Sequence, residues 1–164
     1  MASPPQSLPP NVTRAVRTLG RVLAEIGWEP SPAEGIAGFA VDFGEPHLPV
    51  ATALAAISPA EQFVLYLMFG FTASAERRDE CARLFTRINW VLTVGDFQLD
   101  YDDGAIRFRT SLDFADADLT EPLIRNAVSG AMAAVEAYAN AVADVVARGK
   151  TAAEALAAVE IDEP

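Results

Sequence analysis

The chain has 164 residues, a length typical of one domain, since domains usually run to about 100–200 residues. Apolar residues make up 51% and charged residues 21% of the sequence, which is ordinary globular usage and excludes disorder throughout the chain. One cysteine and one histidine exclude an internal disulfide framework, a four-cysteine zinc site and a histidine-rich metal cluster. The net charge of −11 argues against nucleic acid as a partner, because phosphate binding relies on clustered Lys and Arg.

The acidic charge is concentrated in the second half of the chain. Residues 1–91 carry nine acids and seven arginines, whereas residues 92–164 carry fourteen acids and five basic residues. Such charge keeps a protein soluble and also favours basic partners, and both explanations stay open. Residues 1–10 contain four prolines and no basic residue, so we expect a disordered arm rather than a signal peptide. No apolar stretch approaches the length of about 20 residues that a membrane span needs, and we expect a cytoplasmic protein.

The first expected element is a helix from about Val12 to Ile26. Its apolar residues recur at steps of three and four and share one face: Val12, Val16, Leu19, Leu23 and Ile26. Asn11 is expected to cap the first turn, and Gly27 is expected to end the helix in a left-handed conformation. The opposite face carries arginines at positions 14, 17 and 21. It is either a solvated face near Glu25 or a surface for an acidic partner.

Three strands are expected next. Residues 39–43 alternate between apolar and small or polar positions, as in a half-buried strand. The segment from Leu48 to Leu54 alternates less cleanly, and Pro49 favours an edge or a strand start. Residues 63–69 are all apolar, so we expect this strand to be covered on both faces of the sheet. Short connections favour an antiparallel meander.

A second helix is expected from about Ala75 to Leu92, with Ser74 as its cap. Its apolar stripe comprises Cys81, Leu84, Phe85, Ile88 and Leu92. Because Cys81 lies in this stripe, we expect a buried, unreactive thiol rather than a nucleophile.

The following segment predicts a β-hairpin. A two-residue turn at Asp103-Gly104 would pair Leu99 with Phe108 on one face and Asp100 with Arg107 on the other. The side chains expected to point inward are Phe97, Leu99, Tyr101, Ile106 and Phe108.

The last third predicts a long helix and a short one. Asp118 and Glu121 have the spacing of a capping box, and the long helix is expected to run on to about Arg148 and to end at Gly149. Residues 151–159 begin with a second capping box, Thr151 with Glu154, and predict the short helix.

The long helix carries small residues on more than one side. They either let this helix pack across its own sheet or form a surface for a partner or a second copy, with the candidate residues Ser129, Gly130, Ala133, Ala137, Asn140 and Ala141. From Leu123 to Ala147 the helix would span about 37 Å. A five-stranded sheet is too narrow to cover that length, since strands lie about 4.8 Å apart. The uncovered apolar surface leads us to expect a homodimer.

The sequence predicts no catalytic, cofactor-binding or metal-binding residues. Asp100, Asp102 and Asp103 precede Gly104, but a calcium loop needs glycine at its sixth position and glutamate at its twelfth. His47 lies in a loop where no Ser or Cys is placed to use it as a base. A glycine-rich phosphate loop is also missing.

Several segments resemble the YbjN-type family. They are Leu84 to Gly95 with Ile88-Asn89, then Phe97-Gln98-Leu99-Asp100, the strand Arg107-Phe108-Arg109, and the closing segment Gly149-Lys150-Thr151-Ala152-Ala153-Glu154-Ala155. The resemblance covers about Val12 to Glu160. That family is described as bacterial sensory transduction regulators, with a fold similar to type III secretion chaperones. The resemblance implies a non-enzymatic role in binding or regulation and supplies no catalytic residue.

The expected fold is α+β: a two-layer, twisted antiparallel sheet of about five strands packed by helices, in the order α-β-β-β-α-β-β-α-α. One domain is expected over residues 11–160, between the arm 1–10 and a frayed tail 161–164. The favoured function is a non-enzymatic protein-binding module, either a sensory transduction regulator or a secretion-chaperone-like protein, with an unidentified protein partner. The alternative is a small-molecule-binding sensor or enzyme with a pocket between sheet and helices. We expect no cofactor, nucleic acid or membrane as a partner.

Overall fold

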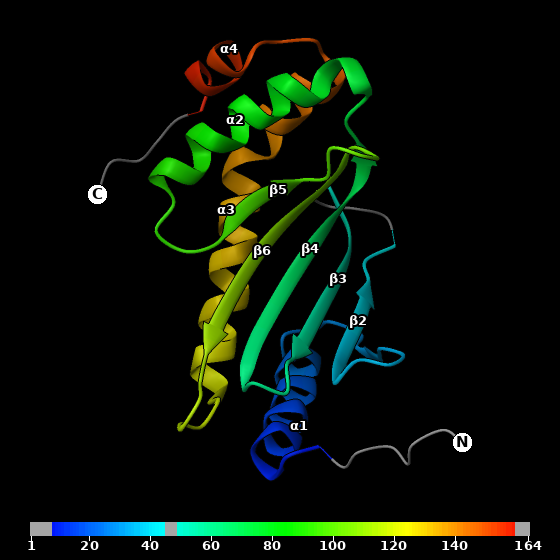
Figure 1. Ribbon diagram of the computed structural model, residues 1–164, viewed down its shortest axis with the longest axis vertical. Coiled ribbons are helices and arrows are strands. Elements are labelled where there is room, and N and C mark those ends of the chain that lie inside the picture. Colours follow the sequence, from blue (N-terminus) through cyan, green and yellow to red (C-terminus); the bar gives the residue numbers. More distant parts are fainter. Residues whose placement is uncertain (1–7, 45–48, 160–164) are drawn as a thin grey trace.

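A computed structural model describes residues 8–44 and 49–159 of the chain. The elements follow one another as in Figure 1: α1 (Pro10–Glu25), β1 (Ser31–Pro32), β2 (Gly38–Asp42), β3 (Val50–Ile57), β4 (Gln62–Thr72), the 3-10 turn η1 (Ala75–Arg77), α2 (Arg78–Val91), β5 (Asp96–Leu99), β6 (Ala105–Asp113), α3 (Glu121–Ala147) and α4 (Ala152–Ala157). The α+β class is confirmed, and the order of elements is as predicted except for the additional strand β1. The described residues do not include most of the predicted arm, the tail 161–164, His47 or Leu48.

The sheet is antiparallel throughout, with the strand order β1-β2-β3-β4-β6-β5. It has six strands rather than about five, because the two-residue strand β1 adds to the edge beyond β2. The long strand β4 pairs with β3 on one side and with β6 on the other. The short strand β5 forms the opposite edge.

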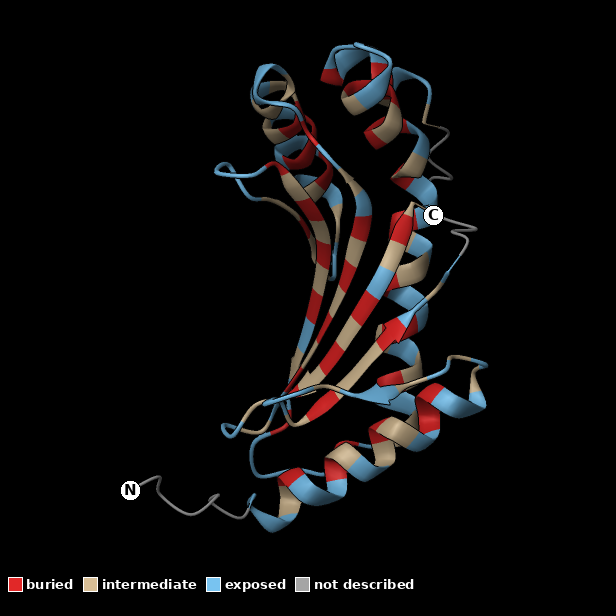
Figure 2. Ribbon diagram, turned by 90° about the vertical axis from the view of Figure 1, so that its right-hand side faces the viewer, coloured by how far each residue is buried: buried red, intermediate tan, exposed pale blue. Residues whose placement is uncertain are grey.

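Helices α1 and α3 run along one face of this sheet (Figure 2). Helix α1 contacts β2 and β3, α3 contacts β4 and β6, and the two helices contact each other. The side chains that point from the sheet toward these helices are fully or almost fully buried, among them Phe63, Leu65, Leu67, Ala55, Ile57 and Phe108. Removing this apolar surface from water is the main favourable term in folding.

The prediction that β4 is covered on both faces was wrong. Burial alternates along the strand, with Phe63, Leu65 and Leu67 buried and the intervening Val64 and Tyr66 only half-buried. Helices α1 and α3 cover one face, and the opposite face is shielded by side chains of neighbouring strands. An unbroken apolar run therefore does not establish a second covering layer.

The hairpin prediction gave the right faces and the wrong register. Leu99 pairs with Ile106, and Phe97 pairs with Phe108, two residues away from the predicted alignment. Because side chains alternate with a period of two, a shift of two residues leaves Phe97, Ile106 and Phe108 inward. Tyr101 lies in the loop instead and is 52% exposed.

The register follows from a five-residue loop, 100–104, in place of the predicted two-residue turn. Asp100 Oδ1 accepts the N–H of Asp102 at 2.8 Å, and Asp103 Oδ1 accepts the N–H of Ala105 at 2.8 Å. Gly104 has a φ of +81°, and a Cβ added there would lie 2.0 Å from the carbonyl oxygen of Ala73. The loop is thus stabilised by its own carboxylates and by close contact with the end of β4. The alternation of apolar residues along the strands does not predict either of these contacts.

Helix α1 begins differently from its prediction. Pro9 is the N-cap, and Asn11 instead donates from Nδ2 to the carbonyl oxygen of Ala117 at 3.1 Å. Gly27 does adopt a left-handed conformation after the helix, with a φ of +85°. The arginine face is not simply solvated. Its ion pairs connect α1 to α3 and the segment before it: Arg14 with Asp118, Arg21 with Glu121 and Glu25 with Arg125.

The two C-terminal helices gave one wrong cap and one confirmed cap. Helix α3 begins at Glu121 after Thr120, so Asp118 and Glu121 do not form the predicted box. Helix α4 does have its predicted box: the N–H of Glu154 donates to Thr151 Oγ1 at 3.2 Å, and the N–H of Thr151 donates to Glu154 Oε2 at 2.8 Å. Among the helices of residues 8–44 and 49–159, none is long and apolar enough to cross a membrane.

Candidate functional site

The residues with nucleophilic or metal-binding chemistry are not assembled into a site. Cys81 lies on the buried face of α2, and burial raises the pKa of its thiol. Asp100 and Asp103 use their carboxylates to form the hairpin loop. Within the ranges that the structure describes, no group of three or more His, Cys, Asp or Glu side chains could hold a metal ion.

The predicted small-residue surface on α3 is divided by the fold. Five of its members lie on the exposed face: Ser129, Gly130, Ala133, Ala137 and Asn140. Ala141 is only 1% exposed and packs into the core of its own chain, so it is not part of that face. Ala141 follows the exposed Ala137 by four residues and lies on nearly the same side of the helix, so its burial reflects packing at the C-terminal end of α3, which α2 and α4 contact (Figure 1). Whether a partner uses the other five stays a prediction.

The face of the sheet opposite α1 and α3 carries a larger candidate surface, which we call the open sheet face. Its centre is apolar and half-buried, and its side near the edge strand β5 is polar. The central side chains are Leu54, Val64, Tyr66 and Met68, and the polar side chains are Asp96, Gln98, Arg107 and Arg109.

The polar side chains form a continuous row across β5 and β6. Arg109 pairs with Asp96 at 3.1 Å, and Asp96 Oδ2 accepts from Gln98 Nε2 at 2.7 Å. Gln98 Oε1 in turn accepts from Arg107 Nε at 2.7 Å. The guanidinium of Arg107 lies over the Tyr66 ring, 4.5 Å from its centroid. One guanidinium of the row is therefore neutralised by a carboxylate, and the other is oriented by a neutral amide and an aromatic ring.

Arg107 keeps its charge available. Among the described residues, it forms no ion pair with a carboxylate. A planar guanidinium that is already oriented can bind a carboxylate through two parallel hydrogen bonds. The open sheet face can thus offer one fixed cation beside an apolar surface.

Two hollows lie on this face. The larger, about 730 Å3, is lined by Met68, Gln98, Arg107 and three residues of the hairpin loop, Asp100, Tyr101 and Asp103. The smaller, about 210 Å3, lies beside Val64, Tyr66 and Arg109. The lining of both hollows includes side chains of the open sheet face, and the larger hollow also reaches Leu99 and Ile106. This position suits a segment lying across the strands better than an enclosed small molecule.

A second exposed surface lies at the end of α2. It was not predicted from the sequence. Trp90 is 90% exposed, and its neighbours Val91 and Val94 are 58% and 62% exposed. The chain's other tryptophan, Trp28, packs edge-on against Phe43 with ring centroids 5.0 Å apart. The signal was available, because Trp90 lies outside the apolar stripe of its helix, on the same face as Arg83.

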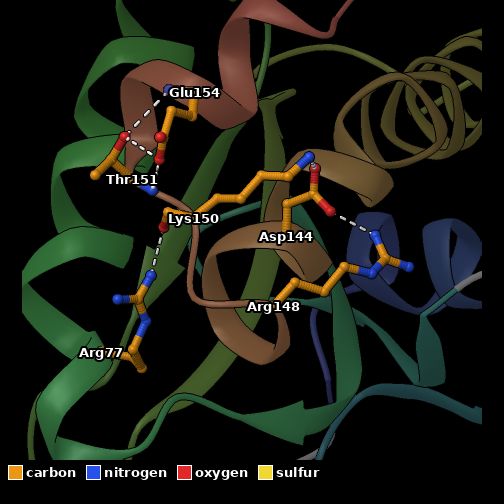
Figure 3. Close-up of polar contacts among 6 residues, drawn as sticks. All are labelled: Arg77, Asp144, Arg148, Lys150, Thr151 and Glu154. Carbon is orange, nitrogen blue, oxygen red and sulfur yellow. Dashed lines mark hydrogen bonds and ion pairs between the residues drawn. The ribbon is translucent and has the colours of Figure 1, made fainter.

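The polar cluster in Figure 3 connects α4 to α3 and η1. Asp144 is 6% exposed, and its carboxylate accepts hydrogen bonds from Lys150 at 2.6 Å and from Arg148. These bonds hold the pKa of Asp144 below its ordinary value. Arg77 donates to the carbonyl oxygens of Val145 and Lys150. Because its polar groups bond to one another and to main chain, this cluster stabilises the corner rather than offering a site.

Asn89 protects the outer edge of β5. Its Nδ2 donates to the carbonyl oxygen of Phe97 at 3.0 Å, and its Oδ1 accepts the N–H of Phe97 at 2.9 Å. The side-chain amide thereby forms the two hydrogen bonds that a neighbouring strand would form. Asn89 belongs to one of the segments that resemble the YbjN-type family, and its role here is structural.

Comparison with known proteins gives a family match. The YbjN family, described as “Putative bacterial sensory transduction regulator”, matches residues 16–144. The crystal structure of YbjN, “a putative transcription regulator from E. coli”, is similar with a TM-score of 0.56 and 14% identity, over 74% of this chain and 89% of that chain. At this identity the likeness shows the fold alone.

The crystal structure of an uncharacterized protein from Methanothermobacter thermautotrophicus is also similar, with a TM-score of 0.48 and 13% identity, over 73% of this chain and 90% of that chain. No curated protein matches the sequence. The family match runs from within α1 to near the end of α3 and includes every strand of the sheet. The chain therefore belongs to the YbjN family.

Proposed function

We propose that the chain is a non-enzymatic regulator that acts by binding another protein on its open sheet face. The observation that carries the proposal is the oriented, unneutralised guanidinium of Arg107 beside the apolar residues of β4. Exposed apolar surface bordered by polar residues is typical of protein interaction sites. The family description as a regulator supports the same class of function.

The partner segment should present a carboxylate next to an apolar side chain. The carboxylate would bind Arg107, and the apolar side chain would lie on Tyr66 and Met68, beside the larger hollow. Asp100 and Asp103 also line that hollow, but each already accepts a main-chain N–H of the hairpin loop. Arginine and tyrosine are enriched among residues that dominate binding energy.

The proposal includes a cytoplasmic location, in keeping with a chain whose single cysteine allows no internal disulfide. It excludes nucleic acid and anionic membranes as partners, since a net charge of −11 opposes both. Signalling regulation and secretion-chaperone-like escort of another protein are both served by such a surface, and the identity of the captured partner would decide between them.

The experiment is capture of partners from the native cell on immobilised protein, with quantitative mass spectrometry. Arg107→Gln and Arg109→Gln form a matched pair, because both arginines lie on the same face of β6, two residues apart. We expect Arg107→Gln to lose at least tenfold of a captured protein that Arg109→Gln retains. Equal capture by wild type and Arg107→Gln would contradict the proposal.

The alternative function, a small-molecule sensor or enzyme, predicts a different result. A small-molecule extract of the same cells would then raise the melting temperature of the protein, and the Arg107→Gln variant would show the same rise if the ligand bound elsewhere. We expect no change in melting temperature with the extract, because both hollows are partly open to solvent and do not enclose a ligand.

A further inference from the structure

The side chains of the open sheet face lie in rows that cross the strands. Residues directly opposite each other in an antiparallel pair point to the same face, so the observed registers define each row. One row, which we call the charged row, runs from β2 through β3 and β4 to β6 and consists of Asp42, Thr52, Met68 and Arg107. The row beside it consists of Ala40, Leu54, Tyr66 and Arg109.

The charged row has opposite charges at its two ends. Asp42 is exposed at the β2 end, where its Oδ1 accepts the N–H of Gly44 at 2.9 Å. Arg107 at the β6 end is oriented by Gln98 and the Tyr66 ring, and it forms no ion pair with a described carboxylate. The half-buried apolar side chains of β3 and β4 lie between these ends. A segment that crosses the strands therefore meets a carboxylate, an apolar stretch and a guanidinium in this order.

We propose that the partner segment is an amphipathic α-helix that lies across the strands, with its N-terminal end over β2 and its C-terminal end over β6. This inference rests on the proposed function, because it names the form of the segment that binds the open sheet face. The charges set the direction of the helix. Its positive N-terminal end lies beside Asp42, and its negative C-terminal end lies beside Arg107.

The spacing of the strands fits the spacing of side chains along one side of a helix. Neighbouring strands lie about 4.8 Å apart, so the members of the charged row lie at about 0, 5, 10 and 14 Å. Helix residues i, i+3, i+7 and i+10 share one side and lie at about 0, 4.5, 10.5 and 15 Å along the axis. In an extended segment the side chains of one side recur about every 6.6 Å. The second of them would fall between β3 and β4.

This geometry predicts the sequence pattern of the partner helix. A basic residue at i faces Asp42, apolar residues at i+3 and i+7 lie over Leu54 and Met68, and an acidic residue at i+10 binds Arg107. The small side chains of Ala40 and Ala56 lie beside Leu54 on the same face. They leave room for the backbone of a helix to approach β2 and β3.

Selection from a library of displayed random peptides tests the form of the segment without the natural partner. Peptides of about 14 residues form four helical turns. The library is first depleted on the Arg107→Gln variant and then selected on the wild-type protein. We expect the enriched peptides to have apolar residues three or four positions apart, followed at the same spacing by an acidic residue.

Two results of the selection would contradict the proposal in different ways. Enriched peptides with apolar residues at alternate positions would indicate an extended segment, which overturns the helix and leaves the proposed function standing. If no peptide distinguishes the wild type from Arg107→Gln, both the helix and the proposed function are overturned.

A charge exchange tests the direction, with an enriched peptide made synthetically and its binding followed by fluorescence anisotropy. Arg107→Glu should weaken binding at least about tenfold, and a peptide with Lys in place of its acidic residue should recover most of this loss. Arg17→Glu makes the same charge change on the exposed side of α1 and should leave binding unchanged. Circular dichroism melting checks that the variants fold.

Asp42→Asn tests the other end of the charged row. Asparagine keeps an oxygen that can accept the N–H of Gly44 and loses the charge, so binding should weaken about threefold. A peptide with the reversed order of residues should bind more weakly than the original. If Asp42→Asn leaves binding unchanged, if the reversed peptide binds equally well, or if the charge exchange recovers nothing, the proposed direction is wrong.

Discussion

The two faces of β4 have similar composition and different surroundings. Leu65 and Leu67 point toward the helices and are fully buried, while Tyr66 and Met68 point the other way and are half-buried. The first set is covered by a layer of helices, and the second by neighbouring side chains of the same sheet, such as Arg107 over Tyr66. Shielding within a single layer leaves a surface that is apolar and still accessible to a partner.

The largest effect should come from truncating the covered face. Leu67→Ala removes fully buried methyl groups and should lower the free energy of unfolding by about 2–5 kcal/mol. Met68→Ala, the next residue on the open sheet face, should cost about 1 kcal/mol or less. Urea unfolding followed by circular dichroism measures both. Equal losses would mean that the two faces of β4 are covered alike.

A smaller effect should come from the edge beside the open sheet face. Asn89→Ala leaves the N–H and carbonyl of Phe97 without their partners, in a half-buried position. We expect a loss of about 1–3 kcal/mol in the free energy of unfolding. Asn126→Ala, at an exposed position of α3, is the control and should change little. The same urea titration measures both variants. If Asn89→Ala lowers the free energy of unfolding by less than Asn126→Ala does, the stabilising role of Asn89 is contradicted.

The third prediction concerns acid. The pKa of Asp144 is lowered by hydrogen bonds from Lys150 and Arg148 relative to its ordinary value of 3.8. A lowered pKa contributes stability that is present above that ordinary value and is lost as the pH falls toward the folded-state pKa. The melting temperature of the wild type should therefore fall in this acidic range. Asp144→Asn should lower the melting temperature at neutral pH and flatten the fall.

The smallest effect should come from the ion pair of the open sheet face. A double-mutant cycle with Asp96→Asn and Arg109→Gln should give a coupling of about 0.2–1 kcal/mol, because both groups are partly exposed to solvent. The coupling should weaken when salt is added. A coupling energy that does not change with salt would show that Asp96 and Arg109 are less accessible to solvent than the structure indicates.

Patterns with a strong period were predicted well from the sequence. The apolar stripe of α2 was right because four of its five predicted residues are buried, and the box at Thr151 was right because it depends on four consecutive residues. The faces of the hairpin were right for the same reason. Its register was not, because it depends on contacts of the loop with Ala73 and Arg78, which lie far away in the sequence.

The candidate surfaces were harder to predict. The predicted register placed Asp100 opposite Arg107. In the observed register Gln98 lies opposite Arg107, and this neutral partner leaves the charge of Arg107 available. Trp90 was missed because the apolar stripe of a helix predicts its buried side chains and says nothing about an apolar residue on the opposite side. Ala141 was placed on the surface because an alanine carries little information about which side of a helix is buried.

Asn89 has a consequence for the behaviour of the protein at high concentration. An edge strand with free N–H and carbonyl groups can pair with a strand of another chain. Repeated pairing of this kind produces fibrils or amorphous aggregates. The amide of Asn89 occupies one such position on β5. Aspartate keeps the acceptor and loses the donor, and glutamine is one methylene too long. Deamidation at this position would therefore remove one of the two hydrogen bonds that occupy the edge at Phe97.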